Sequence, residues 1–122
     1  MAVTQSRDNR TLIAGADLSG SQFLFAKMDS AAKAVVAGNG DGTIGVIEVG
    51  AETGNACTIT HSGKVMVLCG GTVTIADDVG IDAAGKAVNA ASTDAIVGTA
   101  YEAGVNGQLI AIEIALAGDI QA

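Results

Sequence analysis

Proline and tryptophan are absent from the sequence, and aromatic side chains are scarce, with Phe23, Phe25 and Tyr101 the three present. Aromatic residues supply much of the buried area in ordinary cores, so a core here must be built from Val, Ile and Ala. A domain of this size buries only about two thirds of its surface by itself. The scarcity of aromatic residues indicates that oligomer contacts or a large partner bury further surface. A tightly packed monomer is the alternative.

Basic residues are also few, with 6 Lys and Arg against 13 Asp and Glu and a net charge of −7. Binding to nucleic acid needs Lys and Arg in numbers, so this composition argues against a nucleic-acid partner. No apolar run approaches the roughly 18 residues that span a bilayer, which argues against a membrane partner. Residues 1–10 are polar and show no signal peptide, so we expect folding in a bacterial or host cytosol.

What the sequence does contain is a series of short runs rich in Val, Ile and Thr, separated by clusters such as GNGDG, AETGN and DAAG. Short strands with Gly-rich turns are typical of small barrels and sandwiches. The 17 glycines disfavour long helices. We predict a mainly β fold, a small compact β-barrel or β-roll with at most one or two short helices, near residues 29–33 or the C-terminus.

One segment occurs twice. MDSAAKAVVAGNGDGTIG at residues 28–45 returns as IDAAGKAVNAASTDAIVG at residues 81–98, and the correspondence predicts an internal repeat of residues 28–60 and 81–113. Aspartate, lysine and glycine pairs keep one fixed offset, and these residues are expected to shape the repeated turns and strands: Asp29, Lys33, Gly45, Asp82, Lys86 and Gly98. The pattern D-x-A-x-K predicts a tight turn in which the Asp carboxylate accepts backbone N–H bonds. We expect the two halves to pack around a pseudo-twofold axis.

The stretch CTITHSGKVMVLC between the repeats reads as a bridging hairpin. A two-residue turn at Ser62-Gly63 would place Cys57 opposite Leu68, whereas a three-residue loop would place it opposite Cys69. Two cysteines do not make a disulfide framework, and we predict no disulfide.

The N-terminal residues 1–20 differ from the rest and are predicted to form an extended arm, followed by a single β-rich domain at residues 21–122. The arm is polar up to Arg10, and a short apolar patch follows at Leu12 and Ile13. It is either a disordered tail or a segment that orders on a partner.

No catalytic arrangement is visible. The single histidine, His61, has no oriented carboxylate and nucleophile beside it. Asp77-Asp78 and NGDG at 39–42 hold too few oxygen ligands for a metal loop. GNGDGTIG contains a G-x-G-x-x-G spacing but lacks the following helix that holds a phosphate. Lys64 resembles the hairpin lysine of lipoyl carriers without its usual neighbours. We therefore predict no enzyme activity, no cofactor and no metal.

The order and spacing of these segments resemble the capsid decoration (cement) proteins of tailed bacteriophages. The resemblance is carried by ADDVGIDAAGKAV at 76–88 and AIVGTAYEAGVNGQLIAIEI at 95–114, and it covers about residues 17–114. Asp77-Asp78 departs from the family, which more often has Gly-Asp there.

The resemblance implies a structural virion protein on the outer surface of the phage head, made in the host bacterial cytoplasm. It implies a homotrimer that bridges adjacent major capsid subunits and stabilises the head against internal genome pressure. Expected capsid contacts lie in the arm: Arg7, Asp8, Arg10, Leu12 and Ile13. The alternatives are a tail or fibre module, a small carbohydrate-binding module, for which three aromatics are a poor supply, and a carrier domain that would use Lys64.

Overall fold

The computed structural model describes residues 8–39, 41–91 and 95–114. These residues form nine strands and no helix, which confirms the expected mainly β class; residues 29–33 form a turn. The strands are β1 (Asp8–Ile13), β2 (Phe25–Met28), β3 (Ala34–Val36), β4 (Gly45–Val49), β5 (Ala56–Leu68), β6 (Asp78–Ile81), β7 (Ala87–Asn89), β8 (Gly98–Ala100) and β9 (Leu109–Ile114).

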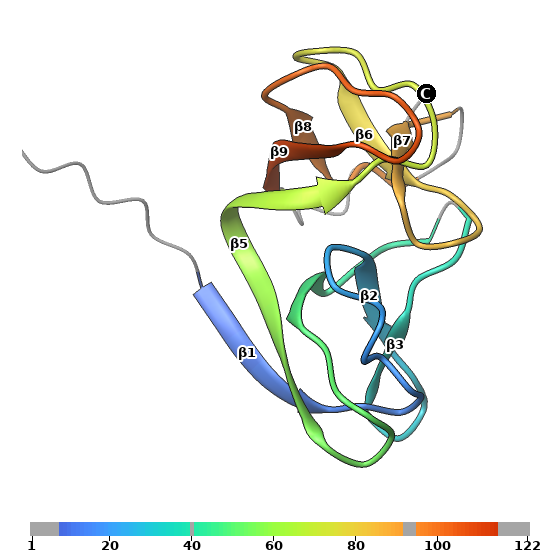
Figure 1. Cartoon of the computed structure of the whole chain (residues 1–122), viewed down its shortest axis with the longest axis vertical. Coiled ribbons are helices and arrows are strands. Elements are labelled where there is room, and N and C mark those ends of the chain that lie inside the picture. The colour runs from blue at the N-terminus through green and yellow to red at the C-terminus, as the bar shows by residue number, and fades with distance from the viewer. Residues whose placement is uncertain (1–7, 40, 92–94, 115–122) are drawn as a thin grey trace, which may run out of the picture.

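One curled antiparallel sheet contains all nine strands, in the order β3-β2-β4-β5-β9-β8-β6-β7, with β1 paired to β5 outside this path. Figure 1 shows two lobes, one built from β1 to β4 and the other from β6 to β9, with β5 running from one into the other. The lobes therefore share a strand and are joined without a linker.

β5 is continuous over 13 residues, so the predicted hairpin is wrong. Its first half pairs with β1 on one edge and β4 on the other, and its second half pairs with β9. Cys57 consequently lies opposite Leu12, and Leu68 lies opposite Leu109. Ser62-Gly63 does not form a turn, because each half of β5 gains backbone hydrogen bonds from a different neighbouring strand. Gly63 accommodates the local twist of the strand with a φ of +98°.

The repeat is longer than its sequence signature. Residues 8–61 form a first repeat and residues 63–114 a second, because β1 pairs with the first half of β5 as the second half of β5 pairs with β9. Each repeat has its own small core at matching positions. In the first repeat these are Ala14, Leu18, Ala26, Ala34, Ile47 and Cys57. In the second they are Cys69, Val73, Val79, Ala87, Ala100 and Ile110.

The two repeats meet in one direction only. Phe25, Ala37 and Val46 of the first repeat are buried in the core of the second, and the Phe25 N–H donates to the Gly85 carbonyl at 2.9 Å. A twofold axis would require the residue matching Gly85, Ala32, to make the same contact, but Ala32 is exposed. The expected pseudo-twofold packing is therefore wrong, and the repeats pack head to tail.

Candidate interaction surface

The two repeated aspartate turns have the same geometry. The Asp29 carboxylate accepts N–H bonds from Ala31 at 2.8 Å and Lys33 at 3.0 Å. In the second repeat, Asp82 accepts the equivalent pair at 2.9 Å each, from residues 84 and 86. The bond from the Lys33 backbone, followed by that from Ala31, holds the pKa of Asp29 below its ordinary value. These turns shape the fold and offer no reactive group.

The repeated glycines mark close backbone approaches. A Cβ on Gly45 would collide with the Thr60 carbonyl, and a Cβ on Gly98 would collide with the Glu113 carbonyl. Each glycine thus allows a short strand to lie unusually close to the last strand of its repeat, with which it pairs. Lys33 is exposed and Lys86 is half-buried, so these two lysines lie in different surroundings.

The segment predicted as an arm contributes a strand to the sheet. Asp8 begins β1, which pairs along β5 up to Ile13, while Arg7 lies outside the described residues. Leu12 packs against the core of the first repeat, and the Ile13 side chain is 43% exposed. Removing residues 1–16 would therefore delete β1 and part of a core, so a deletion that tests the N-terminus must stop at residue 7.

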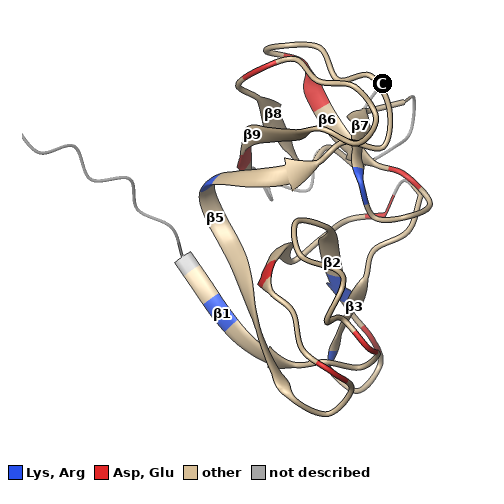
Figure 2. Cartoon of the chain, viewed as in Figure 1, with Lys and Arg blue, Asp and Glu red and all other residues tan. Residues whose placement is uncertain are grey.

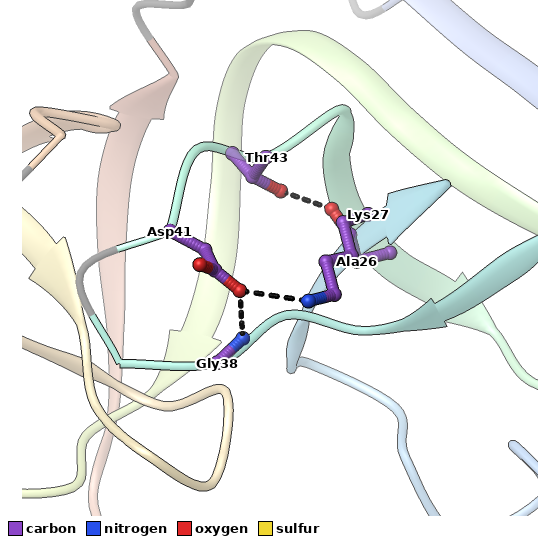
Figure 3. Close-up of polar contacts among 5 residues, drawn as sticks. All are labelled: Ala26, Lys27, Gly38, Asp41 and Thr43. Atoms are coloured by element: carbon purple, nitrogen blue, oxygen red, sulfur yellow. Dashed lines mark hydrogen bonds and ion pairs between the residues drawn. The ribbon is translucent and has the colours of Figure 1, made fainter. Parts of the chain in front are cut away.

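The loop before β4 is closed by an ion pair (Figure 3). The Asp41 carboxylate accepts bonds from the Lys27 ammonium at 2.9 Å and from the Gly38 N–H at 2.8 Å. The bond from Lys27 and then that from Gly38 lower the pKa of Asp41. β4, not a helix, follows this loop. Within the described ranges, no three His, Cys, Asp or Glu side chains are grouped to hold a metal ion.

His61, Lys64 and Cys57 lie in β5, and Cys69 directly follows its last residue. His61 is in the middle of β5, with Nδ1 3.1 Å from the Ile44 carbonyl, and the Lys64 ammonium lies 4.9 Å from the centre of the Tyr101 ring. Cys57 and Cys69 are buried free thiols in different cores. In the part of the chain that the structure describes, no helix has the length and apolarity to cross a membrane.

An open apolar groove of about 250 Å³ lies on the first repeat. Its walls come from β1, the end of β2, the residue just before β4, and β5. Its lining residues are Arg10, Thr11, Leu12, Met28, Ile44, Ile59 and His61. Met28 is 50% exposed on its rim. Arg10 and Leu12 are among the residues that the sequence predicts as capsid contacts, whereas the other lining residues are not predicted from the sequence. Their signal was the repeat itself, since they match apolar positions of the second repeat.

The fold, but no family, emerges from comparison with known proteins. No family model matches the chain, and no curated protein matches it. Among solved structures, the N base of the head fibre protein gp8.5 of bacteriophage phi29 superposes with a TM-score of 0.70 at 16% identity. The alignment covers 93% of this chain and 98% of that one. At this identity the likeness shows that the two chains share a fold.

Proposed function

We propose that this chain is a structural protein of a bacteriophage virion, a decoration (cement) protein that binds the outer surface of the head. The observation that carries the proposal is the fold shared with a phage head fibre base over nearly the whole of both chains. The decoration role itself rests on the sequence resemblance, and the open groove supplies a surface suited to contact rather than reaction.

The proposed mechanism is mechanical. A homotrimer seats on adjacent major capsid subunits, and its N-terminal residues, among them Arg7, Asp8 and the exposed Ile13, contact the capsid. Three linked footprints act as one, which raises the effective affinity by about 10² or more over a single footprint. Many trimers, each adding a modest contact energy, resist separation of the subunits when the packaged genome presses outward.

A fibre base is the second candidate, and the fold shared with the N base of a phage head fibre protein favours it. Such a protein would attach a longer assembly to the head instead of bridging capsid subunits. The two functions differ in the density seen on the virion. A decoration protein gives compact knobs that span subunit boundaries, whereas a fibre base carries further density outward.

The test is to mix the purified protein with expanded, undecorated heads and image them by electron cryomicroscopy. We expect ordered knobs at joints between capsid subunits and a higher temperature of genome release from the decorated heads. Deleting residues 1–7 keeps β1 and should weaken decoration while circular dichroism stays unchanged. Heads that remain bare at saturating protein would overturn the virion proposal, and knobs confined to one subunit would overturn bridging.

A further inference from the structure

The groove of the first repeat and the buried joint of the second repeat are built from the same positions. Arg10 pairs with Ile59 as Val65 pairs with Ile112, which fixes the correspondence. Apart from Thr11, every groove residue matches a buried member of the second core: Val65, Val67, Ile81, Val97, Ile112 and Ile114. The groove is therefore an uncovered version of a surface that the chain covers once already.

The surface that covers the second repeat also has an uncovered counterpart. Phe25, Ala37 and Val46 form the first-repeat face, which is buried at the joint. The matching residues of the second repeat, Asp78, Ala90 and Thr99, form the second-repeat face, and none of them is buried. One chain thus presents one open groove and one open face of the same kind of joint.

The two uncovered surfaces differ from the buried joint in complementary ways. The groove has Arg10 where the second repeat has Val65, and the second-repeat face has Asp78 where the first has Phe25. Figure 2 shows basic side chains (blue) on β1 and acidic side chains (red) on β6, and these two strands lie in different lobes. A joint that forms between separate molecules carries more polar residues than a permanent core, and opposite charges guide its pairing.

We propose that the groove of one copy receives the second-repeat face of another copy, with Arg10 opposite Asp78. The contact repeats between molecules the head-to-tail joint that already exists within the chain. A heterologous contact of this kind closes into a ring when its rotation permits, so internal and intermolecular joints would alternate around the oligomer. The inference deepens the proposed function, whose homotrimer it supplies with an interface.

Cross-linking between two different variants tests the direction of the contact. Arg10→Cys and Asp78→Cys proteins are purified separately, mixed and mildly oxidised, with the native Cys57 and Cys69 buried. We expect disulfide-linked dimers from the mixture and few from either variant alone. A mixture of Asp78→Cys with Lys33→Cys, an exposed residue outside the groove, is the control. Self-linking of Arg10→Cys as strong as the mixed product, or no excess over the control, overturns the proposal.

Charge reversal provides the second measurement, by sedimentation equilibrium. Arg10→Asp and Asp78→Arg should each raise the dissociation constant about tenfold or more, and the combined variant should restore it to within about threefold of wild type. The adjacent exposed Asp77→Arg is the control and should change it by less than about threefold. Far-ultraviolet circular dichroism checks that each variant is folded.

The same measurements separate this proposal from the proposed function. A wild-type chain that stays monomeric at all concentrations overturns the interface. This result is expected if the groove holds residues 115–122 of the same chain, or if its partner is a segment of the capsid. An oligomer indifferent to both reversals overturns it as well. In either case, decoration of heads by the wild-type protein would leave the virion role standing.

Discussion

A single methyl group added at Gly45 should distinguish close backbone approach from simple turn flexibility. Gly45 has a φ of +144°, and its Cβ would collide with the Thr60 carbonyl. We expect Gly45→Ala to lower the free energy of unfolding by about 2–4 kcal/mol, since backbone strain and overpacking act together. Gly42→Ala is the matched control, because its Cβ would meet nothing within 4 Å, and it should cost about 1 kcal/mol or less. Urea denaturation followed by circular dichroism gives both values, and equal losses would contradict the argument.

At the scale of the strands, the joint between repeats makes a matched pair of substitutions informative. Phe25 in β2 is fully buried against the second repeat, whereas Asp78 at the same place in β6 is only partly covered. Phe25→Ala should cost about 3–5 kcal/mol, and Asp78→Ala should change stability by about 0.5 kcal/mol or less. Both are measured by denaturation at a protein concentration low enough to keep the chain monomeric. Tyr101 fluorescence reports the second repeat, so an unshifted Tyr101 transition in Phe25→Ala would refute the joint.

Some features of these strands and turns could be predicted from the sequence and others could not. The aspartate turns and the repeated glycines Gly45 and Gly98 could be predicted from the sequence, because they keep a fixed offset. Each depends on contacts within a few residues or on one close backbone approach. The full length of the repeat is not visible in the sequence, because the offset between the copies changes. The first repeat has two more residues between Leu18 and Phe23 than the second has between Val73 and Ala76. The sequence predicts a hairpin in place of β5, because local turn chemistry does not reveal that two different neighbouring strands pair with its halves. The groove could not be predicted from the sequence, because it exists only where the surface of the first repeat is left uncovered by the second repeat.

For the whole molecule, the one-way joint implies that the two repeats unfold together. The second core contains first-repeat residues, and β5 belongs to both lobes, so losing either repeat exposes part of the other. Cys57 in the first core and Cys69 in the second report on the two separately. Desolvation by burial raises the pKa of both thiols, so little reactive thiolate is present while the fold is closed.

Thiol labelling as a function of urea therefore measures cooperativity directly. We expect Cys57 and Cys69 to show opening free energies within about 0.5 kcal/mol of each other, because one global transition exposes both. Peptide mapping by mass spectrometry assigns each label, and labelling of the fully unfolded chain supplies the intrinsic rates. Labelling of Cys57 at urea concentrations that leave Cys69 protected would mean that the first repeat opens alone. The second core would then survive the loss of Phe25, Ala37 and Val46, and the head-to-tail joint would contribute little to stability either within a chain or between chains.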